Sequence, residues 1–156
     1  EMCIRDRVSV ESDTLGALLY PLEGDTFALD MVIKPERYHE FGIALHVDKE
    51  LETGYFLRMN PKNQLVAWDM WPRGEQGRYQ WQIKGDVPYQ IETARKLPKA
   101  EEYRVHIIKE KDICVVYIND EIVLSTRMYN HKDGYAGIYV VQGNVKLIQY
   151  KEKRSE

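Results

Sequence analysis

The stretch DICVVYINDEIVLSTRM, residues 112–128, decides the fold class of this chain. It contains two runs rich in β-branched residues, 112–119 and 122–128, which are separated by Asn119-Asp120-Glu121. Asn and Asp favour tight turns, because their short side chains bond to the local backbone and tolerate a left-handed conformation. The stretch therefore predicts a hairpin of two antiparallel strands.

Other short runs show the same alternation of apolar and polar residues, and almost none has apolar residues at helical spacing. Many strands with tight connections and no crossover helices predict an all-β, antiparallel β-sandwich. Turns are expected at residues 60–63 and 143–144, and a Gly-, Pro- and charge-rich excursion at 72–98. The further expected strands cover residues 26–33, 41–48, 54–60, 64–71, 89–94, 103–109, 137–142 and 144–150.

The run Ile113–Ile118 is apolar at every position, although an antiparallel sheet with one face in water normally alternates. Either a loop of this chain covers the outward side chains, or a domain absent from the chain contacts them. We expect Ile113, Val115 and Tyr117 to point outward. Cys114 then lies inside, where it is an inert small hydrophobe, since a nucleophilic thiol needs a partly exposed, electropositive setting.

The first seven residues, EMCIRDR, lack the features of a secretory signal. Their back-translation resembles the transposon-end adapter of sequencing libraries, so we expect residues 1–7 to be non-native and to pack against nothing. Cys114 would then be the single native cysteine, and the chain would be the C-terminal piece of a longer protein. The expected organisation is one β-sandwich domain at 8–150, followed by a charged, frayed tail at 151–156.

Composition limits the classes of partner. The 156 residues are 44% hydrophobic and 30% charged, which suits one domain with a real core. A formal charge of −3 and a pI near 5.9 show no basic stripe, so no nucleic-acid partner is expected. The apolar runs are too short to cross a bilayer, so no membrane partner is expected. The compartment stays open, with bacterial cytoplasmic and secreted locations both compatible.

Catalytic and metal-binding motifs are not found in the sequence. It has no HExxH, CxxC, phosphate-binding loop, GxSxG elbow or EF-hand loop, and its four histidines are scattered. We therefore expect no metal and no cofactor. The segment ESDTLG at 11–16 approaches the Glu-x-Asp-x-x-Glu pattern of sandwich-fold glycosidases but lacks the last carboxylate. Asp30, Asp69 and Glu92 lie on different expected strands, so their convergence is open.

Aromatic residues crowd into one region and give the positive sign of a ligand surface. Trp68 alternates with apolar neighbours and is expected in the core, whereas Trp71, Tyr79 and Trp81 fall where the alternation weakens. Exposed aromatic rings stack on sugar faces with little entropy cost. These three residues are therefore candidate carbohydrate-binding residues. The alternative is that they pack the excursion onto the sheet.

Five segments together resemble the C-terminal β-sandwich module of glycoside hydrolase family 32, the family of invertases, levanases and inulinases. They are FGI at 41–43, GYFLR at 54–58, DICVVYIND at 112–120, LSTRMY at 124–129 and GIYV at 137–140. The resemblance implies a concanavalin-like, jelly-roll type sandwich. Relatives of that kind include lectin-like and laminin-G-like modules.

In that family the catalytic carboxylates lie on an N-terminal five-bladed propeller, in motifs similar to WxNDPNG, RDP and EC, and none of them occurs here. The resemblance implies a non-catalytic accessory module of a fructan or sucrose hydrolase. Its partner would be the missing propeller of the same chain, contacted through Ile113, Val115 and Tyr117, although many members have Glu at Val115. Two rivals stay open. One is a lectin-like or laminin-G-like module of another glycosidase that itself binds oligo- or polysaccharide, and the other is an enzyme whose carboxylates are paired only by folding.

Overall fold

The computed structural model describes residues 2–4, 8–71, 89–91, 94–129 and 132–154. These residues form antiparallel β-strands and a short 3₁₀ helix, η1 (Pro61–Asn63), so the predicted all-β sandwich is confirmed. The strands are β1 (Met2–Ile4), β2 (Val8–Pro21), β3 (Thr26–Arg37), β4 (Glu40–Val47), β5 (Gly54–Asn60), β6 (Leu65–Trp71), β7 (Tyr89–Gln90), β8 (Tyr103–Glu110), β9 (Ile113–Ile118), β10 (Ile122–Arg127) and β11 (Tyr135–Arg154).

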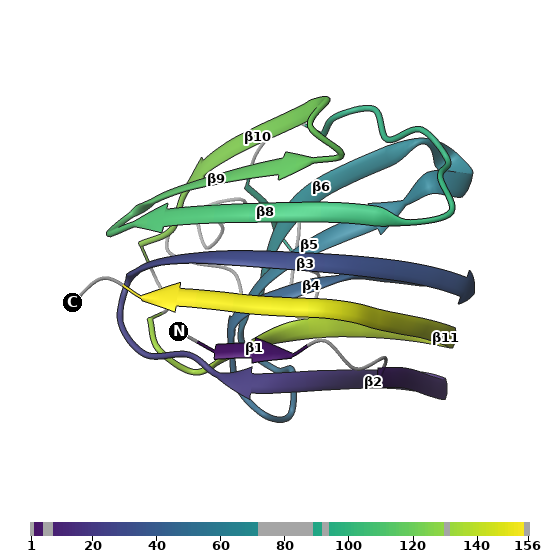
Figure 1. Cartoon of the computed structure of the whole chain (residues 1–156), viewed down its shortest axis with the longest axis horizontal. Coiled ribbons are helices and arrows are strands. Elements are labelled where there is room, and N and C mark those ends of the chain that lie inside the picture. The colour runs from purple at the N-terminus through teal and green to yellow at the C-terminus, as the bar shows by residue number, and fades with distance from the viewer. Residues whose placement is uncertain (1, 5–7, 72–88, 92–93, 130–131, 155–156) are drawn as a thin grey trace, which may run out of the picture.

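The strands form two layers that share β11 (Figure 1). The front sheet has the order β10-β9-β8-β3-β11, and the back sheet has the order β11-β4-β5-β6-β7. The long strand β11 belongs to both, because residues up to Val141 pair with β4 whereas residues from Asn144 onward pair with β3. β2 and β1 lie along the other side of β11.

The hydrophobic core lies between the sheets and is built from alternate residues of each strand. In β9, Cys114 and Val116 are fully buried, while Ile113 and Tyr117 are 46% and 37% exposed. The outward orientation that was predicted for this strand is therefore confirmed. Trp68 of β6 is fully buried, as predicted. The predicted hairpin of β9 and β10 pairs Ile118 with Ile122 at its turn.

The structure corrects the sequence interpretation at three strands. The strand expected at 89–94 is shorter, because β7 covers Tyr89–Gln90 and neither Ile91 nor Ala94 belongs to a strand. The polar stretch of β2 was not predicted, because an edge strand buries little and its alternation is weak. The predicted turn at residues 143–144 is wrong, since β11 continues through it with a shift of register. A Cβ on Gly143 would lie 1.9 Å from the Arg37 carbonyl oxygen. This glycine marks a close backbone approach at a bulge.

Both ends of the chain also differ from expectation. The predicted frayed tail instead extends β11 to Arg154, where Glu152 is buried and accepts a 2.6 Å bond from Arg154 Nε. Residues 1–7 were expected to pack against nothing, yet the backbone of β1 pairs with β11 from Tyr150 to Glu152. The adapter origin of that segment and the domain limits of 8–150 stay predictions.

Candidate functional site

The outer face of the back sheet carries a hollow of about 290 Å³, which we call the first hollow. Gly42, which has no side chain, lies beside Tyr139 under this hollow. A Cβ at this position would lie 2.0 Å from the Leu57 carbonyl oxygen and 2.9 Å from Tyr139 Cε1. The absence of a side chain at Gly42 therefore lets the Tyr139 ring pack closely against the sheet. The hollow is lined by Leu15, Glu40, Leu51, Phe56, Asp69, Trp71, Tyr139 and Val141.

An ion pair stands at one wall of the first hollow. Arg58 Nε donates to Asp69 Oδ2 at 2.9 Å, and the two side chains are 25% and 12% exposed. Burial raises the pKa of Asp69, and the Arg58 guanidinium opposes that rise. Burial acts to lower the pKa of Arg58, but the hydrogen bond to Asp69 and the negative charges of Asp69 and Glu40 together outweigh burial, and the pKa is raised. The hydrogen bond and the opposite charge of Arg58 therefore offset part of the cost of burying the Asp69 carboxylate.

A second polar pair lies beside the first. The Tyr139 hydroxyl donates to Glu40 Oε2 at 3.3 Å, and the Tyr139 ring packs edge-on against Phe56 with centroids 5.6 Å apart. Burial raises the pKa of Glu40, Arg58 opposes that rise, and the charge on Asp69 adds to it. Burial also raises the pKa of Tyr139 well above its usual value, so the phenol stays a neutral donor.

This arrangement combines aromatic faces with fixed acceptors and donors at the edge of a shallow hollow. Phe56 and Trp71 offer apolar ring surface beside Tyr139, which is only 4% exposed, while Glu40 and Asp69 offer carboxylate oxygens. Sugars present a flat CH face and a rim of hydroxyl groups, which these two kinds of group satisfy together. The chemistry of the site therefore suits a neutral polyhydroxy ligand.

The predicted carbohydrate-binding residues are only partly placed by the structure. Trp71 is half-buried at the end of β6 and lines the first hollow. Tyr79 and Trp81 lie outside the described residues. The predicted contact residues Ile113 and Tyr117 lie on the opposite side of the sandwich, on the outer face of the front sheet. Trp71 and these two contact residues therefore lie on separate faces.

Sequence reasoning missed Glu40, Phe56, Arg58 and Tyr139, and left Asp69 undecided. A signal for two of them was available in the turn at residues 60–63. With that turn placed, the hairpin register sets Phe56 opposite Asp69, so that Arg58, two residues along the same face, becomes a diagonal neighbour of Asp69. Glu40 and Tyr139 carried no such signal, because β4 and β11 are distant in sequence.

Other candidate chemistry is not gathered into a site. Among the residues that the structure describes, no group of three or more His, Cys, Asp or Glu side chains could hold a metal ion. Asp30 contacts His106 on the outer face of the front sheet. Cys114 is buried, and that burial raises the pKa of its thiol to about 12, which matches the predicted inert role. No helix in the described ranges is long and apolar enough to cross a membrane.

No protein-family profile and no curated protein sequence matches the chain. Solved structures do share the fold. The carbohydrate-binding module CBM66 from Bacillus subtilis aligns over 93% of this chain and 85% of its own length, with 17% identity and a TM-score of 0.74. A galectin from Caenorhabditis elegans aligns over 96% and 97%, with 13% identity and a TM-score of 0.62.

Larger enzymes contain a similar sandwich as one part. A β-fructofuranosidase from Aspergillus kawachii aligns over 99% of this chain but only 27% of its own, with 12% identity and a TM-score of 0.64. The chain thus spans about a quarter of that enzyme. At these identities the similarity shows the fold alone. That fold is the β-sandwich found in lectins, carbohydrate-binding modules and fructofuranosidases.

Proposed function

We propose that the chain is a non-catalytic carbohydrate-binding module that holds one sugar residue in the first hollow. The observation that carries this proposal is the grouping of Trp71, Phe56 and Tyr139 with two carboxylates on one outer face. Glu40 and Asp69 are held in place by Tyr139 and Arg58, so little ordering is needed on binding. The likeness to a carbohydrate-binding module and a galectin supports the same function.

Binding to a small panel of sugars tests the proposal. Fructose, sucrose, inulin and levan fragments, lactose and mannobiose would be titrated by calorimetry and by tryptophan fluorescence. We expect millimolar or tighter binding of at least one sugar. Trp71→Ala should weaken it about tenfold or more, because the ring supplies stacking surface. Tyr117→Ala, on the front sheet, is the matched control and should bind as the parent does. No binding across the panel would overturn the proposal.

We infer that the parent protein is a family-32-like fructan or sucrose hydrolase and that the module also stabilises its propeller. The specific observation is the apolar outer face of the front sheet, where Ile108, Ile113 and Val123 are 42%, 46% and 47% exposed. A contiguous patch of exposed apolar side chains usually marks a surface that contacts another protein or domain. Upstream DNA of the same locus that encodes a propeller with its acidic motifs would support this assignment. Any other upstream domain would contradict it.

The two carboxylates of the first hollow also allow a direct test of the enzyme alternative. Glycosidases need one protonated and one ionised carboxyl group, and burial raises the pKa of both Glu40 and Asp69. Asp69 is bound by Arg58, which favours its ionised form and occupies one of its oxygens. We therefore expect no hydrolysis of sucrose, levan or inulin. Turnover that Glu40→Gln or Asp69→Asn abolishes would establish an enzyme instead.

A further inference from the structure

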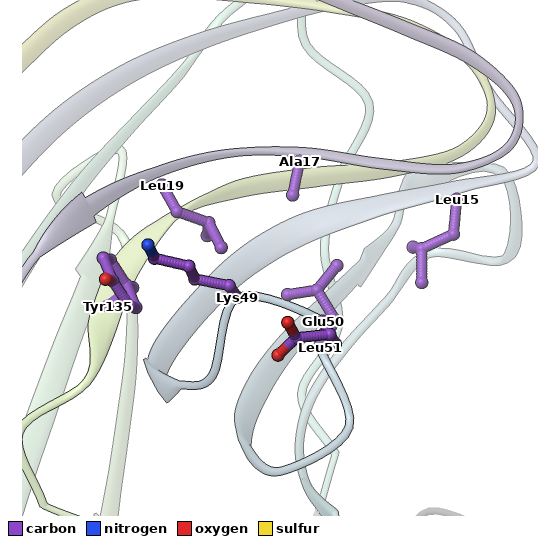
Figure 2. A pocket seen from close by; sticks show the side chains of 7 residues that line it. All are labelled: Leu15, Ala17, Leu19, Lys49, Glu50, Leu51 and Tyr135. Atoms are coloured by element: carbon purple, nitrogen blue, oxygen red, sulfur yellow. The ribbon is translucent and has the colours of Figure 1, made fainter.

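A second hollow of about 380 Å³ lies between β2 and the connection from β4 to β5. Figure 2 shows Tyr135 and the side chain of Lys49 close together at one end and Leu15 at the other. The Lys49 ammonium stands 5.5 Å from the centroid of the Tyr135 ring. The hollow is lined by Leu15, Ala17, Leu19, Lys49, Glu50, Leu51 and Tyr135.

The second hollow continues the first. Leu15 and Leu51 line both hollows, so they form the ridge between the two. Both hollows lie beside β11. Tyr135 lines the second hollow and Tyr139 the first, and these residues, four apart in the strand, project from the same face. The outer face of the back sheet therefore offers two adjoining places, each with an aromatic ring and charged groups.

We propose that the second hollow is a subsite for the next residue of the same glycan chain, so that the ligand is a neutral oligosaccharide of at least two units. The inference rests on the proposed function of the first hollow. Tyr135 supplies ring surface with the Lys49 ammonium over the ring, and Lys49 and Glu50 supply a donor and an acceptor for hydroxyl groups. The apolar ridge of Leu15 and Leu51 suits the linkage between two residues, which offers few hydroxyls.

The opposite charges of Lys49 and Glu50 favour a neutral ligand. An acidic sugar at the second hollow would meet Glu50 there and two further carboxylates in the first hollow, Glu40 and Asp69. A neutral chain meets no such repulsion and can use both charged side chains as hydrogen-bond partners. Affinity should therefore rise with chain length, without a requirement for an anionic group.

Calorimetric titration of the full chain with three matched series tests the subsite. The probes are fructose with levanbiose and levantriose, galactose with lactose, and mannose with mannobiose and mannotriose. In the series that binds, we expect at least tenfold tighter binding of the two-unit or three-unit sugar than of the monosaccharide. Ala17→Phe, which fills the second hollow, and Tyr135→Ala should remove this gain while leaving monosaccharide affinity within about twofold.

Control variants separate the subsite from a change in folding. Tyr135→Phe keeps the ring and should keep the gain, whereas Glu40→Gln in the first hollow should weaken monosaccharide and oligosaccharide alike. Equal affinity for one unit and for longer chains would overturn the subsite while the proposed function stands. A chain-length gain that survives both Ala17→Phe and Tyr135→Ala would also overturn it. Binding of no sugar in any series would overturn the proposed function, and the subsite with it.

Discussion

The outer face of the back sheet and the outer face of the front sheet differ in the kind of side chain that they expose, although both are built from antiparallel strands. The back sheet places its charged groups outside and pairs them, Arg58 with Asp69 and Glu40 with Tyr139. The front sheet leaves apolar side chains such as Ile113 outside, and it buries Lys109 inside at 1% exposure. The difference is the one that the two proposals require, a polar ligand on one face and an apolar contact on the other.

The sharpest test of this comparison uses two neighbouring valines of β9 that face opposite ways. Val116 is fully buried, so Val116→Glu places an unpaired carboxylate in the core and should cost about 4 kcal/mol or more. Val115 is on the outer face beside Ser125, so Val115→Glu should change the unfolding free energy by about 0.5 kcal/mol or less. Urea unfolding of both variants measures the difference. A large loss for Val115→Glu would show that this face is already covered.

The ion pair of the back sheet offers the next largest effect. Arg58→Met leaves Asp69 with its charge and only 12% exposure, so it should cost about 2 kcal/mol. Asp69→Leu in the same chain should return most of that loss, because the Asp69 charge is then gone and Glu40 keeps the hydrogen bond from Tyr139. A double-mutant cycle by urea unfolding checks this coupling. If the two single losses simply add, the pair does not act as a unit.

Lys109 tests the inner side of the front sheet. Its ammonium lies 5.8 Å from the Phe27 ring centroid and has no hydrogen-bond partner among the residues that the structure describes. Burial lowers the pKa of Lys109, so the folded chain holds this proton less strongly than the unfolded chain does. Lys109→Met should therefore raise the unfolding free energy at pH 7 by about 1–3 kcal/mol.

The pH dependence gives the sign of this effect. Between the lowered pKa of the folded chain and the ordinary value near 10.4, the unfolded state binds more protons, so parent stability should rise with pH. The advantage of Lys109→Met should shrink over the same range and level off above it. Parallel urea titrations from pH 7 to 10 measure this. A constant difference between the two proteins would mean that Lys109 stays charged when folded.

The fold could be predicted from the sequence because its signal is local. The alternation of apolar and polar residues predicted the strand that contains Trp68. The outward orientation of Ile113 and Tyr117 was predicted for their strand, and Asn119-Asp120 predicted the turn between β9 and β10. β2 escaped prediction because an edge strand buries too little to show a period. The turn predicted at Gly143 was wrong because sequence alone does not distinguish a glycine at a β-bulge from a glycine in a turn.

The candidate site was less predictable because it depends on strand pairing across the chain. Tyr139 and Glu40 are 99 residues apart, and only the pairing of β11 with β4 brings them together. Trp71 was a candidate from the sequence because it is aromatic and lies where the alternation weakens. Its partners Glu40 and Arg58 are ordinary surface residues in the sequence, since a charged residue on the outer face of a strand is the common case.

The smallest expected effect concerns the exposed apolar residues of the front sheet. Ile113→Ser with Tyr117→Ser should shift the unfolding free energy by about 0.5 kcal/mol or less, because both side chains are already substantially exposed. Sugar binding should stay unchanged, since both residues lie on the opposite sheet. Self-association, followed by light scattering at rising concentration, should fall, because an apolar surface that faces water favours association.

A loss of about 2 kcal/mol in the unfolding free energy would instead place these side chains in the core. Weaker sugar binding would mean that the two outer faces are coupled, and the division of the sandwich into a polar ligand face and an apolar contact face would fail.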